Sequence, residues 1–356
     1  MKLLITGGCG FTGSTLARAF PELDPTIEIY AVDNLARPGS EENRLCLNRL
    51  GVRVIHGDVR CPSDLYALPK VQWVIDASAN PSVLAGVSSN ASSQQLLEHN
   101  LVGTINLLEY CKRNKAGFIL LSTSRVYSIA PLVSLPLTVS NEAYHPRFGS
   151  CSVAGLSGEG VAENFSTTPP LSLYGATKLA SEILALEYGE AFGLPIWINR
   201  CGVLAGAGQF GRPEQGIFAF WINAYLRRQQ LKYIGFDGRG YQVRDCLHPR
   251  DVATLVRKQM QSPERKADRV QNVSGGVQSA MSLAQLSAWC ADRFGKHHVG
   301  HDSAARPYDV PWIVLDSTKA KRQWDWQPNL PVGQILEEIA QHAEEHPEWL
   351  EISSST

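Results

Sequence analysis

Three residues of this 356-residue chain have the side chains and the spacing that proton transfer requires. Tyr174 and Lys178 are four positions apart, so a helix over this stretch would place the phenol and the ammonium on one face. A tyrosine with a pKa of about 10 is a poor base at neutral pH, but a nearby cation favours the phenolate and lowers that pKa. Thr123 ends an apolar run, where its hydroxyl can meet the same substrate oxygen. Together they predict a general base that accepts the proton of a hydroxyl group during its oxidation.

A glycine-rich turn near the N-terminus has the form of a dinucleotide-binding loop. An apolar run at 2–5 leads into it and an amphipathic segment follows, which is the strand, loop and helix of a βαβ unit. The glycines allow a sharp turn, the approach of a pyrophosphate and helix–strand packing, and the helix N-terminus offers N–H groups to the phosphates. The sequence fits GxGxxG from Gly8 and GxxGxxG from Gly7. We expect the loop to bind a cofactor through Gly7, Gly10, Phe11, Thr12 and Gly13.

An acidic residue at the end of the next apolar run indicates which dinucleotide binds. The run at 28–32 ends at Asp33, twenty residues after Gly13, where the fingerprint places the acid that binds the ribose. A carboxylate there accepts hydrogen bonds from the adenosine ribose and repels a 2′-phosphate, which favours NAD over NADP. Arg37 follows closely and would partly offset that repulsion. An aspartate that merely caps a loop is the alternative interpretation.

Further apolar runs alternate with helical segments along the first 200 residues. The predicted strands cover 52–55, 72–75, 118–121 and 196–200, and the longest helices cover 92–113 and 174–192. This alternation predicts an α/β fold with a doubly wound parallel sheet of the Rossmann type. Ligands of such sheets bind beyond the carboxyl ends of the strands. Four of the chain's residues are expected at that edge: Asp33, Asp58, Ala77 and Thr123.

The chain is expected to divide into two parts. Residues 1–200 are predicted to form the NAD-binding domain, and residues 201–350 a smaller α+β lobe that binds the substrate and interleaves with the last strands of the sheet. A segment at 128–170, rich in Ser, Pro and Gly, interrupts the first part, and a loop of this length is usually a lid or a functional insertion. In the lobe the pattern predicts helices near 217–228, 251–261, 282–294 and 332–346, and a hairpin around 233–243.

The composition excludes several classes of function. The net charge is −1 and no polybasic cluster occurs, so neither nucleic acid nor a membrane surface is an expected partner. Eight cysteines are scattered without C-x-x-C spacing, which is typical of reduced thiols rather than of a disulfide framework, and we expect no metal site. The sequence shows no signal peptide and no apolar stretch of about eighteen residues. We expect a cytoplasmic protein.

These motifs, taken together, resemble the extended short-chain dehydrogenase/reductase superfamily, and the similarity runs from residue 2 to about residue 328. The motifs that carry it, in chain order, are the glycine loop, Asp33, Asp58-Val59, the stretch Asn-Leu-Val-Gly-Thr-Ile-Asn-Leu-Leu-Glu that begins at Asn100, the Ser-Thr-Ser-Arg-Val-Tyr motif at 122–127, and Tyr174 with Lys178.

The resemblance assigns roles to these residues. It implies that Asp58 and Val59 hold the adenine, that Lys178 also contacts the nicotinamide ribose, and that Thr123 and Tyr174 flank the reacting carbon. The catalytic residues are then Thr123, Tyr174 and Lys178. The full set expected to bind NAD is Gly7, Gly10, Phe11, Thr12, Gly13, Asp33, Asn34, Asp58, Val59, Ala77, Ser78, Ala79, Asn100, Ser122, Tyr174 and Lys178.

The C-terminal half carries the motifs expected to bind a nucleotide-diphosphate sugar. Arg244 in Arg-Asp-Cys-Leu-His and Arg306 in Arg-Pro-Tyr-Asp match the superfamily's diphosphate contacts, which suits the planar fork of arginine. The nucleotide base is placed beside the segment that contains Gln209, Phe210 and Gln215. The residues expected to bind the substrate are Thr123, Arg125, Gln209, Phe210, Gln215, Arg244 and Arg306.

Two positions favour one branch of the superfamily. Its dehydratases and decarboxylases have a glutamate where this chain has Arg125, and the dehydratases also have an aspartate where it has Ser124. A cation at Arg125 instead resembles the CDP-paratose 2-epimerase (CDP-tyvelose epimerase) family. The chain also departs from the superfamily. The usual His-Leu-Ala-Ala is Asp-Ala-Ser-Ala at 76–79, so we expect a different contact to the phosphate edge of the cofactor. The usual Asn-Val-Tyr-Gly is Val-Leu-Ala-Gly at 203–206.

The resemblance implies an NAD-dependent epimerase that inverts carbon 2 of a CDP-hexose through a keto-sugar, working as a homodimer or homotetramer. Three alternatives stay open. They are a UDP-sugar 4-epimerase, a nucleotide-sugar reductase or dehydrogenase that exchanges its cofactor at each turnover, and a non-catalytic NAD(H)-binding protein on the same fold.

Overall fold

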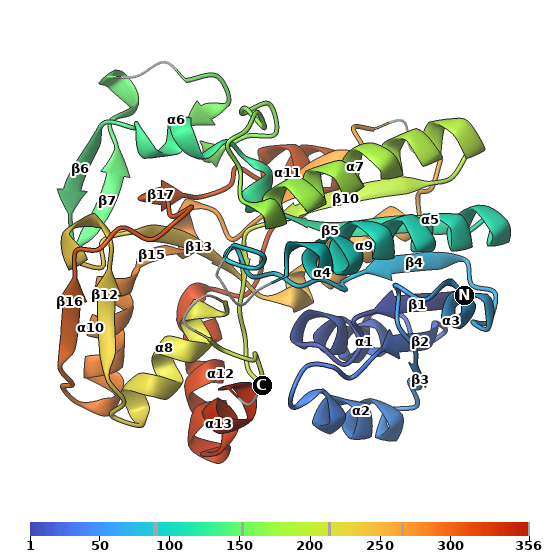
Figure 1. The fold of residues 1–356 in the computed structure, drawn as a ribbon, viewed down its shortest axis with the longest axis horizontal. Helices are drawn as coiled ribbons and strands as arrows, with labels where there is room; N and C mark the ends of the chain where they lie inside the picture. The colour runs from blue at the N-terminus through green and yellow to red at the C-terminus, as the bar shows by residue number, and fades with distance from the viewer. Residues whose placement is uncertain (88–91, 151–152, 213–214, 265–266, 355–356) are drawn as a thin grey trace.

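Seven parallel strands form the main sheet of the computed structural model, which describes residues 1–87, 92–150, 153–212, 215–264 and 267–354 (Figure 1). Every neighbouring pair in this sheet is parallel. The order across the sheet is β14 (Val270–Val273), β10 (Ile196–Cys201), β5 (Gly117–Thr123), β4 (Trp73–Asp76), β1 (Lys2–Thr6), β2 (Glu28–Asp33) and β3 (Arg53–His56). The predicted doubly wound α/β fold is confirmed. The strand order reverses at β1: β2 and β3 follow on one side of it, and β4, β5, β10 and β14 on the other.

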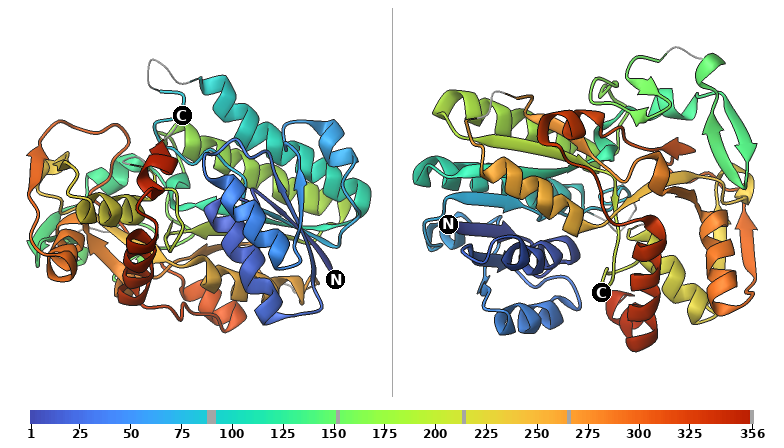
Figure 2. Two further views of the ribbon diagram at one scale, coloured as in Figure 1. Left: turned by 90° about the horizontal axis from the view of Figure 1, so that it is seen from below. Right: turned by 180° about the vertical axis from the view of Figure 1, so that it is seen from behind.

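Helices cover both faces of this sheet, and each strand supplies apolar residues to both (Figure 2). In β1, Leu3 and Ile5 pack toward one face and Leu4 toward the other, which explains why the strands are continuous apolar runs. One face is covered by α1 (Phe11–Leu23), α2 (Ser40–Arg49), α9 (Pro249–Met260) and α11 (Thr318–Trp324). The other face is covered by α3 (Pro62–Tyr66), α5 (Gly103–Asn114) and α7 (Leu173–Phe192).

The two longest predicted helices are present. The predicted helix at 92–113 is α4 (Ser93–Leu97) and α5, joined by a π-helical turn (Glu98–Val102). Helix α7 begins where the side chain of Ser172 accepts a hydrogen bond from the backbone N–H of Gly175 at 3.0 Å, and it ends at Gly193, whose φ of +63° suits a residue without a Cβ. These caps fix where the turn that carries Tyr174 begins.

A second group of elements lies beyond the carboxyl edge of the sheet. A four-stranded sheet contains β11 (Val203–Leu204), β13 (Val243–Leu247), β15 (Ala280–Ser282) and β17 (Trp312–Ile313). A parallel pair joins β12 (Leu231–Ile234) to β16 (Val299–Asp302). The helices packed here are α8 (Ile217–Leu226), α10 (Leu283–Phe294), α12 (Val332–Glu345) and α13 (Trp349–Ser354). No helix of the described residues has the length and apolarity to cross a membrane.

The predicted hairpin around 233–243 is wrong. Strand β12 pairs with β16, which lies more than sixty residues later, and β13 pairs with β11, β15 and β17 instead. A strand can be predicted from its own short stretch of sequence, but that stretch carries no information about which strand is its partner.

Except for residues 151–152, which lie outside the described part of the chain, the segment at 128–170 folds into short elements. They are α6 (Ile129–Val133), the hairpin of β6 (Leu137–Ser140) and β7 (Ala143–Pro146), a 3₁₀ turn (Phe148–Ser150), and the pair β8 (Leu156–Ser157) and β9 (Gly160–Val161). The backbone N–H of Val161 donates to the carbonyl of Val314 at 2.8 Å, and the rings of Tyr144 and Tyr241 meet edge to face. The segment is thus packed against the second group of elements.

Candidate active site

A cavity of about 660 Å³ opens beyond the carboxyl ends of β1, β2, β4, β5 and β10. The glycine loop and the ends of these strands form one wall, and residues of the second group of elements form the other. This is the position at which ligands of open α/β sheets bind. No described residue of the 128–170 segment lines the cavity, so the packed segment does not act as its wall.

The glycine loop fits a dinucleotide phosphate. Gly7 has a φ of +60°, and a Cβ on it would lie 2.9 Å from the carbonyl oxygen of Ala77. A Cβ on Gly13 would lie 2.1 Å from the carbonyl oxygen of Gly7, so only glycine lets α1 pack on the turn. Helix α1 begins at this loop without a side-chain cap or an acidic residue in its first turn, which leaves its N–H groups available to an anion. Gly7, Gly10 and Gly13 all line the cavity, whereas Gly8 packs against Ala31.

Asp33 lies at the end of β2 with its carboxylate fixed by backbone groups. It accepts hydrogen bonds from the N–H of Cys9 at 2.9 Å and of Leu35 at 2.8 Å. Burial raises the pKa of the Asp33 carboxyl, and these N–H groups oppose that change. The oriented carboxylate lines the cavity, as a ribose-binding acid must.

Arg37 contacts the opposite side of the cavity rather than standing free beside Asp33. Its guanidinium donates to the carbonyl of Phe210 at 3.2 Å and to Oε1 of Gln215 at 3.1 Å, and it lies over the Phe210 ring. These N–H groups of Arg37, the residue expected to partly offset the repulsion of a 2′-phosphate, therefore donate to protein acceptors.

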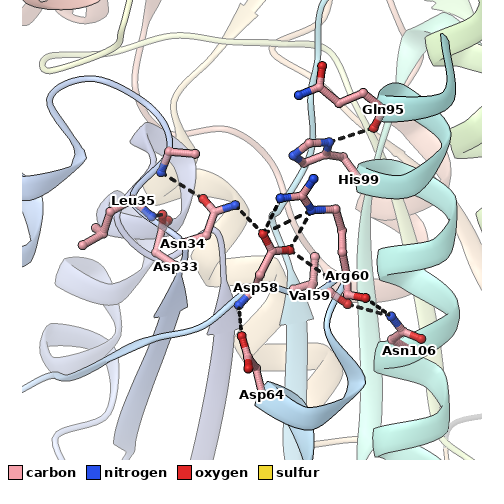
Figure 3. A network of polar contacts seen from close by, with 11 residues as sticks. Asp33, Asn34, Leu35, Asp58, Val59, Arg60, Asp64, Gln95, His99 and Asn106 are labelled. Atoms are coloured by element: carbon pink, nitrogen blue, oxygen red, sulfur yellow. Dashed lines mark hydrogen bonds and ion pairs between the residues drawn. The ribbon is translucent and has the colours of Figure 1, made fainter. Parts of the chain in front are cut away.

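The loop after β3 is held by a polar network around Asp58 (Figure 3). Asn34 donates to the Asp58 carboxylate at 2.9 Å from one side, and Arg60 binds it from the other with Nη2 at 2.7 Å from Oδ2. These donors hold the pKa of the Asp58 carboxyl well below its usual range. Asn106 donates to the carbonyl of Val59 at 2.9 Å. Arg60 was missed in the sequence, because nothing in the motif marks a residue that orders the loop.

The chain after β4 forms the next part of the wall. Ala77, Ser78 and Ala79 line the cavity. Asn100 does not; it lies behind this wall, where its Oδ1 accepts from the N–H of Asn80 at 2.8 Å and its Nδ2 donates to the carbonyl of Asn80. The residue predicted to bind the cofactor thus supports the segment that faces the cavity.

The three expected catalytic residues are brought together. Thr123, Tyr174 and Lys178 all line the cavity, and the Tyr174 phenol is hydrogen-bonded to the Thr123 hydroxyl. Burial raises the pKa of Tyr174 to about 12, against the lowering effects of this hydrogen bond and of the charge of Arg125. Burial also lowers the pKa of Lys178. The sequence predicts that Lys178 lowers the tyrosine pKa, but in this structure burial outweighs any such effect.

Three arginines converge beyond the tyrosine. Arg125 donates to the carbonyl of Tyr308 at 3.1 Å, and Arg244 pairs with Asp309, with Nη2 at 2.7 Å from Oδ1. Arg306 lines the same part of the cavity. Burial and the charge of Arg244 lower the pKa of Arg125 to about 10. This concentration of positive charge suits a ligand with several anionic oxygens.

The segment with Gln209, Phe210 and Gln215 also lines the cavity, but it adjoins the glycine loop. The Phe210 ring stacks on Trp349 of α13 and belongs to a small apolar cluster with Phe11 of the loop. Gln209 donates from Nε2 to the carbonyl of Leu204 at 2.7 Å, and its buried Oε1 has no hydrogen-bond partner among the described residues.

Part of the far wall was not foreseen from the sequence. It is formed by residues of α8, β12 and the chain before β13, including Phe218, Trp221, Lys232, Ile234 and Gln242. Gln242 donates from Nε2 to the carbonyl of Ile234 at 2.9 Å. Lys232 and Ile234 belong to β12, whose pairing with β16 no local signal reveals.

The described residues contain no cluster of three His, Cys, Asp or Glu side chains that could hold a metal ion. The described cysteines are all free, and Cys151 lies outside the described part of the chain.

Comparisons with known proteins cover the cavity and most of the chain. The model of the NAD dependent epimerase/dehydratase family matches residues 3–274. CDP-paratose 2-epimerase of Salmonella typhi is 28% identical over 93% of this chain and 95% of its own length. dTDP-glucose 4,6-dehydratase of Streptomyces niveus is 26% identical over 99% and 95%. The structure of UDP-glucuronic acid 4-epimerase from Bacillus cereus, in complex with UDP-glucuronic acid and NAD, has a TM-score of 0.77 at 24% identity and covers 97% of this chain and 99% of that one.

Proposed function

Because this chain belongs to the NAD dependent epimerase/dehydratase family, we propose that it inverts carbon 2 of a CDP-hexose through a keto-sugar intermediate. One observation supports this choice within the family. Tyr174, which is buried and hydrogen-bonded to Thr123, shares its cavity with Arg125, at the position where relatives that eliminate water have an acid.

The reaction begins with proton transfer to Tyr174. Its phenolate takes the proton of a sugar hydroxyl, and Thr123 holds the same oxygen through its hydroxyl. Bound NAD would supply the oxidising equivalent, accepting a hydride from the sugar carbon and returning it to the opposite face. After the keto-sugar has rotated in the cavity to present its other face, Tyr174 gives the proton back to the new alcohol. Lys178 favours the phenolate through its charge.

The residues beside the base favour hydride return over elimination. Dehydration needs a group that removes a proton from the carbon next to the carbonyl. Ser124 and Arg125 occupy the positions of the acids that do so in the superfamily's dehydratases, and a guanidinium cannot act as a base in a protein. Arg125 instead has the charge and the N–H groups to orient a sugar hydroxyl or the keto oxygen. The identities to an epimerase and to a dehydratase are nearly equal, so these two residues carry the distinction.

The substrate would span the cavity. Arg244 and Arg306 would hold the diphosphate, and the segment of Gln209, Phe210 and Gln215 would lie beside the nucleotide base. A CDP-sugar is favoured by the likeness to CDP-paratose 2-epimerase. In this proposal residues 1–200 bind NAD through the residues named above, residues 201–350 mainly bind the substrate, and the enzyme works in the cytoplasm.

We also propose that two copies of the chain associate. Helices α4, α5 and α7 lie side by side (Figure 1), and α4, α7 and the π turn carry several exposed large apolar residues, including Leu97, Val102, Ile183 and Phe192. Such a patch favours association with another apolar surface, and in a homodimer it would meet its own copy.

The decisive experiment incubates the protein with a panel of CDP- and UDP-hexoses and locates the inverted carbon by NMR. We expect inversion at carbon 2 of a CDP-hexose, a product mass equal to the substrate mass, and NAD retained after dialysis. Inversion at carbon 4 of a UDP-sugar would overturn the substrate assignment. Loss of water, or steady release of NADH, would overturn the reaction. Tyr174→Phe is the inactive control.

A further inference from the structure

A buried carboxylate lies directly behind the cavity wall at the end of β4. Asp76 is only 1% exposed. Its Oδ1 accepts hydrogen bonds from the Thr6 hydroxyl at 2.8 Å and from the Ser78 hydroxyl at 2.6 Å, and its Oδ2 from the Thr104 hydroxyl at 3.2 Å. All of these donors are neutral, and Asp76 forms no ion pair with the described residues. A buried charge is costly unless an opposite charge compensates it.

Lys178 carries the opposite charge and is also buried. Its side chain is 2% exposed and also lacks an ion pair among the described residues. The titratable groups that act on its charge are Asp76 on β4, Glu182 on its own helix and Cys201 on β10, with Tyr174 one turn before it.

Only one of these four groups is a free counter-charge. Glu182 is already paired with Arg200, with Oε2 at 2.7 Å from Nη2. Burial raises the pKa of the Cys201 thiol and of the Tyr174 phenol to about 12 each, so both are neutral near pH 7. The carboxylate of Asp76 is the one that forms no ion pair with a cation of the described residues.

A chain of polar contacts connects Asp76 to the turn of α7 that carries the lysine. The Thr104 hydroxyl that contacts Asp76 also lies 2.9 Å from the carbonyl of Asn100. Asn100 donates to the Thr177 hydroxyl at 3.3 Å, and the Ser181 hydroxyl donates to the Asn100 carbonyl at 3.3 Å. Thr177 and Ser181 flank Lys178, so the carboxylate and the lysine belong to one rigid unit.

We infer that Asp76, although it forms no direct ion pair with Lys178, is the counter-charge of this lysine and positions it, in its protonated form, beside Tyr174. Asp76 does not line the cavity and so acts through Lys178 rather than on the substrate. This role explains why an aspartate is tolerated at the end of a central strand. It rests on the proposed function only for the importance of Lys178 in the reaction, not for the pairing itself.

The pairing is tested without any substrate, by urea unfolding of Asp76→Asn, Lys178→Met and the double variant. Each single change leaves one buried charge uncompensated, whereas the double change leaves none. We expect the urea midpoint of the double variant to fall by less than the sum of the decreases seen in the two single variants. Strictly additive losses would overturn the pairing.

Asp251→Asn provides the matched control. Asp251 is a buried carboxylate on α9 whose oxygens accept backbone N–H groups of Asn329 at 3.0 Å and Leu330 at 3.1 Å. Combined with Lys178→Met, it should give additive losses, because it is no partner of the lysine. If the Asp251 and Lys178 changes were as non-additive as the Asp76 and Lys178 changes, the coupling would be a general effect of buried carboxylates. That result would also overturn the inference.

The positioning role is tested on the NAD-loaded enzyme with the hexose identified above. Without the carboxylate the pKa of Lys178 falls, so Asp76→Asn should move the alkaline limb of the turnover profile to lower pH by about one unit. An unchanged limb would overturn the positioning role even where the urea cycle shows coupling. This pH profile also tests the inference if Lys178→Met does not fold. If the protein acts on none of the panel sugars, the proposed function is wrong, and the urea cycle still tests the pairing.

Discussion

Glu182 and Arg200 form a buried ion pair, with Oε2 of the glutamate 2.7 Å from Nη2 of the arginine, and the pair ties helix α7 to strand β10. The Glu182 carboxylate also accepts from the Ser122 hydroxyl, and Arg200 also donates to the Tyr127 hydroxyl at 3.2 Å. Because α7 carries Tyr174 and Lys178, this pair holds the proposed base at a fixed height above the carboxyl edge of the sheet.

Removing one charge of this pair should strongly destabilise the protein. Glu182→Gln leaves the Arg200 guanidinium buried without its partner, and we expect a loss of about 3–5 kcal/mol in the free energy of unfolding, measured with urea. Glu337→Gln is the control, since Glu337 is 52% exposed and its pairing with Arg293 should be worth under about 1 kcal/mol. Equal losses would show that the α7–β10 link is unimportant.

NAD should bind at least about tenfold more tightly than NADP in titrations of the cofactor-free protein. The reason is Asp33, whose fixed carboxylate accepts ribose hydroxyls and repels a 2′-phosphate. Arg37→Ala should leave this preference unchanged, because the guanidinium is engaged with Phe210 and Gln215. Equal affinities for the two cofactors, or a preference that changes in the variant, would contradict this assignment.

Tyr174→Phe should lower the turnover rate by about 10²–10⁴-fold while NAD stays bound, since only the proton-transferring hydroxyl is lost. Lys178→Ala should reduce both cofactor binding and rate. Near-normal turnover by Tyr174→Phe would exclude the proposed base.

The same residue gives a test by pH. Burial raises the pKa of Tyr174 to about 12, so this phenol should stay protonated in the cofactor-free protein until the pH approaches that value. The difference in ultraviolet absorbance between the wild type and Tyr174→Phe reports the phenolate. A phenolate signal at neutral pH without ligand would contradict the dominance of burial.

Arg125→Met should lower kcat/KM for the sugar nucleotide by about ten- to a hundredfold, the loss expected for one hydrogen bond to a charged group, and leave NAD affinity unchanged. Arg125→Lys keeps the charge but not the planar fork and should lose less. Steady-state kinetics and NAD titration of both variants separate the two outcomes. Equal activity of Arg125→Met and the wild type would remove Arg125 from the substrate site.

Ile183→Arg on α7 should convert a dimer into monomers in light-scattering measurements, because it places a charge in the exposed apolar patch. Leu45→Arg on α2 is a matched control, since both side chains are 55% exposed in the single chain. A wild-type monomer, or a dimer that both variants preserve, would contradict the proposed interface.

The sequence predicts most of the fold and the family because these depend on local signals. The glycine loop, the acid after β2 and the alternation of apolar runs each lie within a short stretch, and the family match over residues 3–274 confirms the predicted superfamily resemblance. The β12–β16 pairing, the contacts of Arg37 and the burial of Tyr174 all depend on residues far apart in the chain. The sequence therefore predicts which side chains have the right chemistry, but neither the sign of the tyrosine pKa change nor the buried carboxylate behind the wall.

The cluster of Phe11, Phe210 and Trp349 has a consequence for the order of events during synthesis. The glycine loop is synthesised more than three hundred residues before α13, which packs against it. Contacts of such long sequence separation form late in folding. A nascent chain therefore exposes an unfinished nucleotide loop until α13 has emerged and docked, and firm capture of the cofactor would have to wait for that contact.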